Sequence, residues 1–281
     1  MSEVPVAESS KQRTRPQVVA HRGSSEEHAE HTLRAYRRAL DAGVDGLECD
    51  VRLTSDGHLV CVHDRRIDRT SSGRGLVSTS PLADLEREDF GSWKQPWADL
   101  DDELEEDPAD HVLTLEALFA LVRDWDRPVQ LAVETKHPTR YAGLVERQLV
   151  DLLRQYGWAH KAEDEGGQRV RVMSFSRVSL RRVHDLAPAV PTVFLIDRVR
   201  RRHRDGSLPR GNVIAGPSID VVRRFPRYVA KAQAKGHAVH VWVVNDQADL
   251  ELCKELGVDV VITDRPEHAL RLFGDQDDTD T

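Results

Sequence analysis

The stretch Leu47–Asp64 reads Leu-Glu-Cys-Asp-Val-Arg-Leu-Thr-Ser-Asp-Gly-His-Leu-Val-Cys-Val-His-Asp. An Asp-Gly pair between two β-rich runs is a strong hairpin signal, because a two-residue type I′ turn requires positive φ at both central residues. With this pair at positions 56 and 57, the turn predicts that Asp50 lies directly opposite His63. Glu48 shares their face because strand residues alternate with a period of two. The opposite face is apolar and is expected to pack against the protein: Val51, Leu53, Val60 and Val62.

The rest of the chain alternates short β-rich runs with helical stretches, which is typical of βα units around a parallel sheet. Eight strands are expected when the return arm of the hairpin is left out: Val18–His21, Gly46–Val51, Val129–Lys136, Val170–Ser174, Pro191–Ile196, Asn212–Ala215, Ala238–Val244 and Val258–Thr263. Helices are expected at Thr32–Ala42, Leu115–Asp124, Tyr141–Tyr156, Ser179–Leu186, Pro226–Lys235 and Asp246–Leu256. This pattern predicts an α/β fold, a (β/α)8 TIM barrel. A doubly wound sheet is the alternative, but no Gly-rich dinucleotide fingerprint follows any strand.

Three segments fall outside the alternation. Residues 65–128 interrupt it and predict a loop insertion after the β-hairpin, with a solvated acidic run at Asp99–Asp110. Residues 1–16 and 274–281 are polar or acidic and are expected to be disordered tails. A single barrel domain is therefore predicted over residues 17–273.

Composition narrows the class of protein. The 281 residues are 39% hydrophobic and carry a net charge of −8, which argues against broad nucleic-acid binding. The three cysteines have no metal-ligand spacing and are expected to be reduced thiols. The first residues contain no apolar signal region, and no run approaches the ~18 apolar residues of a membrane span. We therefore expect a cytoplasmic protein without a membrane span, and the sequence leaves its oligomeric state open.

Polar residues stand at the carboxyl ends of two other predicted strands. His21 and Arg22 end an apolar run, and Glu134 and Lys136 share one face of the strand Val129–Lys136. Active sites of barrel enzymes lie at this end of the strands. Buried parallel strands are normally apolar, so charged residues there cost stability unless they bind something. Taken singly, His21 can be explained as a structural histidine, and Glu134 with Lys136 as an ion pair. Together they favour a metal site over a structural ion-pair network.

The donor types indicate which metal. Glu48, Asp50 and Glu134 offer only oxygen, which suits Mg²⁺ or Ca²⁺ rather than zinc. Arg22 and Lys136 offset the excess negative charge, and a guanidinium matches phosphate oxygens in bidentate geometry. The two histidines, His21 and His63, then suit proton transfer because an unperturbed imidazole has a pKa near 6.5.

The sequence resembles the glycerophosphodiester phosphodiesterases over roughly residues 18–270, within the phosphatidylinositol-phospholipase-C-like phosphodiesterase superfamily. The shared motifs, in order, are His21-Arg22-Gly23, Glu48-Cys49-Asp50-Val51, Thr54–Gly57, His63-Asp64, Asp68-Arg69-Thr70, Gly91-Ser92-Trp93, Leu113–Glu116, Val133–Lys136, Trp242–Asn245 and Gly257–Asp264. The resemblance implies a (β/α)8 barrel, one divalent cation at Glu48, Asp50 and Glu134, and catalysis by His21 and His63. It also implies phosphate contacts from Arg22 and Lys136, and a wall beside the substrate's alcohol from Trp242, for which packing in the core is the alternative.

One residue departs from the family pattern, and one basic run lies outside the shared motifs. The family usually has Pro-Glu-Asn-Thr after His-Arg-Gly, whereas this chain has Ala29-Glu30-His31-Thr32, so His31 replaces an asparagine near the metal. Its imidazole can donate a hydrogen bond or ligate through nitrogen, while Thr32 is also a good helix N-cap. The basic run Arg198–Arg204 is expected to be a solvated loop, with steering of an anionic substrate as the alternative.

The expected activity is metal-dependent hydrolysis of a small glycerophosphodiester to sn-glycerol 3-phosphate and an alcohol. In the mechanism that the resemblance implies, a glycerol hydroxyl attacks phosphorus and water then opens the cyclic product. His21 is assigned as base and His63 as acid in the first step, with the roles reversed in the second. The alternatives are a lysophospholipase D-like lipid phosphodiesterase and a non-catalytic barrel that binds phosphodiesters.

Overall fold

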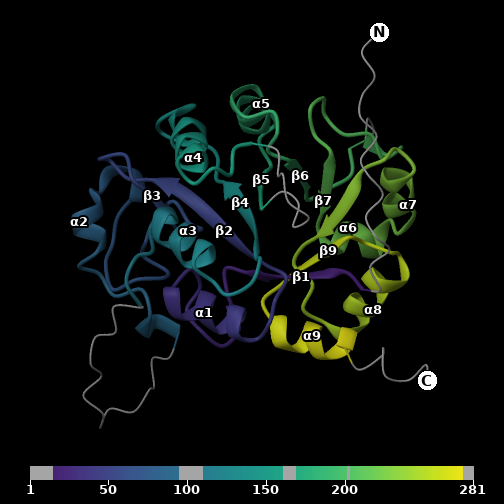
Figure 1. Ribbon diagram of the computed structural model, residues 1–281, viewed down its shortest axis with the longest axis horizontal. Coiled ribbons are helices and arrows are strands. Elements are labelled where there is room, and N and C mark those ends of the chain that lie inside the picture. Colours follow the sequence, from purple (N-terminus) through teal and green to yellow (C-terminus); the bar gives the residue numbers. More distant parts are fainter. Residues whose placement is uncertain (1–14, 95–109, 161–168, 201–202, 275–281) are drawn as a thin grey trace.

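Eight parallel strands close into a barrel in the computed structural model, which describes residues 15–94, 110–160, 169–200 and 203–274 (Figure 1). The strands are β1 (Gln17–His21), β2 (Gly46–Leu53), β4 (Gln130–Thr135), β5 (Val170–Ser174), β6 (Thr192–Ile196), β7 (Ile214–Pro217), β8 (Ala238–Val241) and β9 (Val260–Thr263). Neighbours pair in chain order, and β1 pairs with both β9 and β2, which closes the barrel. The predicted (β/α)8 barrel is confirmed.

Helices surround the barrel on the outside (Figure 1). They are α1 (Leu33–Asp41), α3 (Leu115–Arg123), α4 (Leu144–Gln155), α5 (Arg177–Leu186), α6 (Ile219–Arg224), α7 (Arg227–Gln233), α8 (Gln247–Glu255) and α9 (Pro266–Gly274). The hydroxyl of Thr32 accepts from the backbone N–H of Ala35 at 3.2 Å, so the predicted N-cap of α1 is confirmed. The sequence analysis missed α6 and α9. The first is only six residues long, which is too short for a clear helical period.

The hairpin is present, but its register differs from the prediction by one residue. Strand β3 (Leu59–Cys61) runs antiparallel to β2, and Val51 pairs with Cys61, so Asp50 faces Val62 rather than His63. The turn is not the two-residue type I′ form. The backbone N–H of Thr54 donates to His58 at 2.9 Å, and only Gly57 of the intervening residues has positive φ, at +93°. This geometry is a longer loop with a glycine bulge, which shifts the return arm by one position.

The one-residue slip also moves the apolar side chains of the return arm, because the period of a strand is two. Val51 and Leu53 pack in the main core together with Leu59 and Cys61. Val60 and Val62 instead belong to a separate cluster under the inserted segment: Val60, Val62, Ile67, Val77, Leu85, Phe90 and Val112. The prediction that all four valines and leucines of the hairpin share one face was therefore wrong.

The insertion after the hairpin forms a short-element cap beside the barrel. It contains the 3₁₀ turns η1 (Val77–Thr79) and η2 (Ser92–Lys94) and the one-turn helix α2 (Leu82–Leu85), and α2 lies at the periphery of the molecule (Figure 1). Most of the predicted acidic run and of both predicted tails lies outside the described residues. Among the described residues, no helix is long and apolar enough to cross a membrane.

The lower barrel interior is mostly apolar, although Arg171 and His240 are also buried there, and the carboxyl ends of the strands are charged. Alternate strand residues fill the lower interior with buried apolar side chains: Val19, Ala132, Met173, Val193, Leu195, Ile214, Val260 and Ile262. Along β2 the inward residues Glu48 and Asp50 are both carboxylates. On β4 the inward residue after Ala132 is also a carboxylate, Glu134. The apolar layer therefore supports a polar site from below, at the end of the barrel where active sites of this fold lie.

Candidate active site

Three carboxylates meet inside the barrel mouth. Glu48 and Asp50 point inward from β2, and Glu134 lies beside Asp50 because the two residues are register partners on neighbouring strands. Their exposed fractions are 1%, 0% and 7%. Each offers one oxygen, and the three oxygens lie within 4.8 Å of one another. The convergence predicted from the sequence is present, and it survives the slipped hairpin because β2 alone sets the positions of Glu48 and Asp50.

The charges of this trio fit a divalent cation. Burial, followed by the charge of Asp50, raises the pKa of Glu48 well above its usual value and that of Glu134 to about 7. Burial would also raise the pKa of Asp50, but Lys136, the hydrogen bond from His31 and Arg22 hold it well below the usual value. Three buried carboxylates thus resist joint ionisation, and a cation would remove that penalty. Because the donors are all oxygens, Mg²⁺ or Ca²⁺ suits the set.

Two cationic side chains already contact the trio. Arg22 Nε lies 2.9 Å from Asp50 Oδ2, and Lys136 Nζ lies 2.9 Å from both Asp50 Oδ1 and Glu134 Oε2. The backbone N–H of Arg22 donates to a side-chain oxygen of Glu48 at 3.2 Å, which joins β1 to β2 at the site. Arg22 adopts a left-handed conformation with φ of +59°. Both predicted phosphate-binding residues therefore stand next to the predicted metal ligands.

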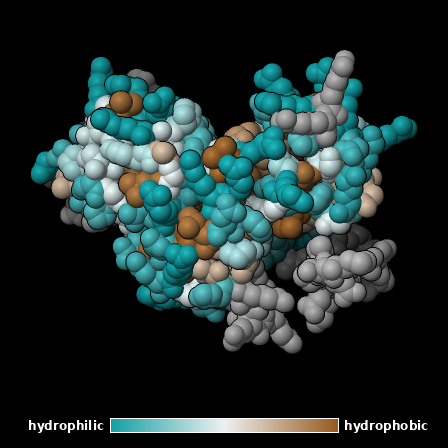
Figure 2. Space-filling view, turned by 90° about the horizontal axis from the view of Figure 1, so that it is seen from above, coloured by the Kyte–Doolittle hydropathy of each residue, from teal (hydrophilic) through white to brown (hydrophobic). Residues whose placement is uncertain are grey.

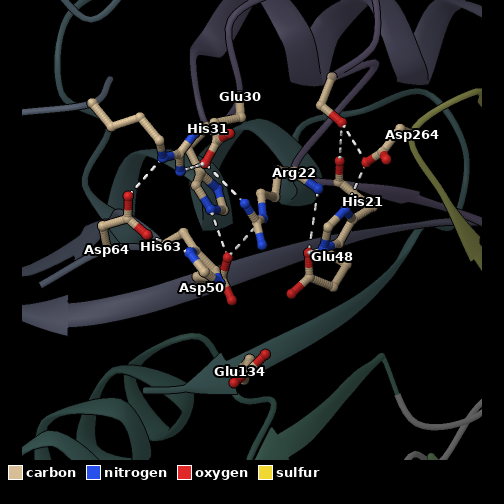
Figure 3. A network of polar contacts seen from close by, with 12 residues as sticks. His21, Arg22, Glu30, His31, Glu48, Asp50, His63, Asp64, Glu134 and Asp264 are labelled. Carbon is tan, nitrogen blue, oxygen red and sulfur yellow. Dashed lines mark hydrogen bonds and ion pairs between the residues drawn. The ribbon is translucent and has the colours of Figure 1, made fainter. Parts of the chain in front are cut away.

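His21 is held by a carboxylate that the sequence analysis did not single out. Its Nδ1 lies 2.6 Å from Asp264 Oδ1, while its Nε2 lies 3.9 Å from Glu48 Oε2 (Figure 3). Asn245 Nδ2 donates to the other Asp264 oxygen at 2.7 Å, and Ser25 Oγ donates to Oδ1 at 2.8 Å. Burial would raise the pKa of Asp264, but these three partners hold it well below the usual value. The ionised carboxylate fixes the imidazole with Nδ1 protonated and Nε2 directed to the site.

Asp264 and Asn245 belong to motifs that carried the family resemblance, although no role was assigned to them. Asp264 directly follows β9, at the carboxyl end of a barrel strand. That position was the signal that could have identified it, since the same argument identified His21 after β1.

His63 is held by a second, separate carboxylate. Its Nδ1 lies 2.7 Å from Asp64 Oδ1, and Arg69 Nε donates to Asp64 Oδ2 at 2.6 Å. Arg69 also makes two hydrogen bonds to Glu30, at 2.9 and 2.7 Å, and Glu30 pairs with Arg22 at 2.9 Å (Figure 3). A chain of alternating charges thus connects His63 to the buried carboxylates. Burial, with Arg22 and Lys136, outweighs Asp50 and lowers the pKa of His63 to about 4.

His31 contacts a metal-ligand candidate from the side. The residue is 5% exposed, and its Nε2 lies 3.0 Å from Asp50 Oδ2. Its Nδ1 lies 2.8 Å from the hydroxyl of Tyr36. Burial lowers the pKa of His31. The carboxylate of Asp50 can only accept, so His31 Nε2 donates to it, and the hydroxyl of Tyr36 donates to the backbone carbonyl of Glu48 at 3.2 Å. This arrangement favours the hydrogen-bond role over direct ligation, because the nitrogen that faces the site already carries the proton.

A cleft of about 350 Å³ opens beside Glu134 and His63. It is lined by Arg52, His63, Asp64, Arg65, Glu134, Thr135, Lys136, His137, Ser174 and Phe175. Trp242 packs edge-on against Phe175 at a ring distance of 5.4 Å, and its Nε1 donates to Gly216 at 2.7 Å. Phe175 lines the cleft and Trp242 does not, so Trp242 reaches the cleft only through its contact with Phe175, and its role as a wall beside the alcohol stays a prediction. Arg198 and Arg200 of the predicted basic run line a different recess, and positions 201–202 of that run lie outside the described residues.

The chain is similar to known proteins of one family. A sequence model of the Glycerophosphoryl diester phosphodiesterase family matches residues 21–268. The chain is 47% identical over 251 residues to the Probable glycerophosphodiester phosphodiesterase 1 of Mycobacterium tuberculosis, covering 89% of this chain and 90% of the relative. It is 31% identical over 255 residues to the Glycerophosphodiester phosphodiesterase of Bacillus subtilis, covering 89% and 84%.

Solved structures share the fold. A phosphodiesterase of Oleispira antarctica, in complex with the product sn-glycerol-3-phosphate, aligns with a TM-score of 0.75 at 24% identity, covering 92% of this chain and 97% of that one. A putative glycerophosphoryl diester phosphodiesterase of Silicibacter pomeroyi aligns with a TM-score of 0.77 at 23% identity, covering 94% of each chain. Together with the family match over most of the barrel, these results show that the chain belongs to the glycerophosphoryl diester phosphodiesterase family of enzymes.

Proposed function

We propose that this enzyme hydrolyses small glycerophosphodiesters to sn-glycerol 3-phosphate and an alcohol, with the help of one divalent cation. Family membership supports the reaction class, and the related Oleispira antarctica enzyme was solved with sn-glycerol-3-phosphate as its product. The observation that carries the proposal is the buried trio of Glu48, Asp50 and Glu134 between two histidine–aspartate pairs. A purely structural ion-pair network has no need for two imidazoles, each oriented by its own carboxylate.

The proposed ligands of the cation are Glu48, Asp50 and Glu134. A bound Mg²⁺ or Ca²⁺ would supply Lewis-acid polarisation of a phosphate oxygen and stabilisation of the attacking oxygen. Arg22 and Lys136 would contact the remaining phosphate oxygens, because both stand within 2.9 Å of the ligand carboxylates. The guanidinium presents a planar pair of donors that matches two phosphate oxygens.

The proposed proton transfers use the two imidazoles in turn. The glycerol hydroxyl next to the phosphodiester gives its proton to His21 Nε2 as its oxygen bonds to phosphorus. The bond from phosphorus to the alcohol oxygen breaks, and His63 protonates that oxygen. In the second step water opens the cyclic phosphate with the roles reversed. The assignment of His63 to the alcohol side follows from the cleft, since His63 lines the space of about 350 Å³ in which a variable alcohol has room.

As the proposed acid, His63 must carry a proton when the substrate is bound. With a pKa of about 4 in the free protein, its imidazole is neutral near pH 7 and lacks the proton that an acid must donate. An anionic phosphodiester close to the ring favours the charged form, so substrate binding raises this pKa. Titration of His63 by NMR, in protein freed of metal, is expected to move upward when sn-glycerol 3-phosphate is added. An unchanged titration would exclude His63 as the acid.

The direct test is hydrolysis of glycerophosphocholine by the purified protein. Activity is expected to disappear in excess EDTA and to return with Mg²⁺ or Ca²⁺, with sn-glycerol 3-phosphate and choline as the products. Full activity in excess chelator would remove the metal from the proposal. The absence of hydrolysis with any divalent cation, despite tight ligand binding, would favour the non-catalytic barrel.

A lysophospholipase D-like activity is the second candidate, and one observation favours it. Phe175 is 44% exposed and lines both the cleft and a neighbouring recess of about 220 Å³ that also contains Phe194, Leu195 and Ile196. An acyl chain could lie in this recess. The face in Figure 2 is mostly hydrophilic, with apolar groups near its centre. Rates on lysophosphatidylcholine and glycerophosphocholine separate the two candidates.

The cytoplasmic location stays a prediction.

A further inference from the structure

A second, narrow recess shares lining residues with the cleft and has an unusual charge. The recess holds about 30 Å³ and shares Arg52, Arg65 and Lys136 with the cleft. Its full lining is Arg52, Leu53, Arg65, Val77, Ser78, Lys136, Pro138, Thr139, Arg140, Tyr141 and Val145. Four of these side chains are cations, and none of the lining residues is an acid. The recess therefore differs from the cleft beside it, in which Asp64 and Glu134 contribute negative charge.

The arginines of the recess are not neutralised by ion pairs. Arg52 donates twice to the backbone carbonyl of His63, at 2.9 and 2.7 Å, rather than to a carboxylate. Within the described part of the chain, no acidic group lies within ion-pair distance of Arg52, Arg65 or Arg140. Arg22 and Arg69, which also lie near the site, have carboxylate partners at 2.9 Å or closer. The three recess arginines are thus available to an external anion.

Bringing these cations together has an electrostatic cost. The side chains of Arg52, Arg65, Lys136 and Arg140 line one recess, and like charges that share a recess repel one another. A cluster of like charges in a concave site raises the local concentration of counter-ions. The cost is offset when an anion binds there, which is how unpaired arginines at a site mouth are usually explained.

The walls of the recess are built from well-anchored segments. The hydroxyl of Tyr141 donates to the carbonyl of Ser78 at 2.5 Å, which ties the segment after β4 to the insertion. The backbone N–H of Val77 donates to the carbonyl of Arg65 at 3.1 Å. The insertion, the segment after β4 and strand β2 therefore meet around one opening. Its small volume suits the oxygens of one anionic group rather than a complete head group.

We propose that this recess binds an anionic group carried by the leaving alcohol, so that the preferred substrates are glycerophosphodiesters whose alcohol bears a carboxylate or a phosphate. The inference rests on the proposed function, because it places the alcohol on the His63 side of the cleft. Arg52 connects the recess with His63, because its guanidinium donates to the backbone carbonyl of His63 and also lines the recess. Glycerol, which is constant among the substrates, needs no such contact.

The test compares substrates that differ by one anionic group, with the metal-loaded enzyme. The carboxylate arm compares glycerophosphoserine with glycerophosphoethanolamine, and the phosphate arm compares glycerophosphoglycerol with its terminal phosphate monoester. In each arm we expect kcat/KM to be about three- to tenfold higher for the substrate with the extra anion, at low ionic strength. The preference should fall as salt is added, because it arises from partly exposed charges.

The variant Arg140→Gln removes one exposed charge that lines the recess but not the cleft, and it touches none of the proposed catalytic residues. We expect the preference to fall towards unity, with little change in kcat/KM for glycerophosphoethanolamine. Arg37→Gln, on the exposed outer side of α1, is the matched control and should keep the preference. Equal rates for each wild-type pair, or a preference that Arg140→Gln retains in full, would overturn the inference. No hydrolysis of any of the four substrates would instead contradict the proposed function.

Discussion

The two halves of the barrel mouth differ in the chemistry of their side chains, which are ionisable in one half and mostly apolar in the other. Strands β1, β2 and β4 end in ionisable side chains that contact one another: His21, Arg22, Glu48, Asp50, Glu134 and Lys136. On the other side, the inward residues of β5 to β7 at this end are apolar or small, Met173, Leu195 and Gly216, and Trp242 directly follows β8. The charged half carries the groups that chemistry requires, while the apolar half excludes water and strengthens their electrostatic interactions. Substitutions in the first half should therefore lower kcat, and those in the second should change KM.

Glu48→Gln tests this division most strongly. The variant keeps the size of the side chain but removes one of three charged ligands, so we expect kcat to fall on the order of 10³-fold and Mg²⁺ to bind more weakly. Hydrolysis of glycerophosphocholine and calorimetric metal titration measure both effects. Glu116→Gln on the exposed surface of α3 is the control. Wild-type kcat in Glu48→Gln would remove this residue from the proposed metal site.

Asp264→Asn asks whether the charged half depends on orientation as well as on charge. An amide can donate to His21 Nδ1, which moves the ring proton to Nε2 and blocks the base. We expect kcat to fall on the order of 10²-fold, with metal affinity unchanged. The conversion of Asp41, an exposed residue at the end of α1, to asparagine should have no effect. A loss of metal binding in Asp264→Asn would mean that Asp264 supports the carboxylate trio rather than His21.

His31→Leu removes the donor that contacts Asp50 from the side. The hydrogen bond at 3.0 Å orients that carboxylate, so we expect metal affinity to fall about tenfold with a smaller change in kcat at saturating metal. His31→Asn restores a donor of the type that the family usually has and should recover most of the affinity. If the two variants lose affinity equally, then the hydrogen bond is not the function of His31.

Trp242→Leu probes the apolar half and should have the smallest effect. The ring supports Phe175 from behind at a distance of 5.4 Å, so its loss loosens the wall of the cleft. We expect KM for glycerophosphocholine to rise about three- to tenfold while kcat stays within about twofold. Steady-state kinetics at saturating metal measure this split. A large fall in kcat would mean that Trp242 takes part in the chemical step. The proposed division between a charged and an apolar half would then be wrong.

The hairpin shows where prediction from the sequence succeeded and where it failed. Alternation along one strand placed Glu48 and Asp50 together inside the barrel, and this part holds because it involves no other segment. The position of the return arm depended on the turn type, and a loop with a bulge at Gly57 replaced the expected two-residue turn. His63 nonetheless reaches the cleft, because Arg52 holds its carbonyl after the chain has left the ladder.

The amino-acid sequence by itself determined the βα alternation, the barrel and the residues that end its strands, because strand period and motif order are local properties. Only the tertiary structure decided which carboxylate orients each histidine. Asp264 lies 243 positions from His21 in the chain, whereas Asp64 is adjacent to His63. The closure of the barrel brings β9 beside β1 and makes the first of these contacts. Partners across such a separation depend on the packing of the whole fold, which no local pattern encodes.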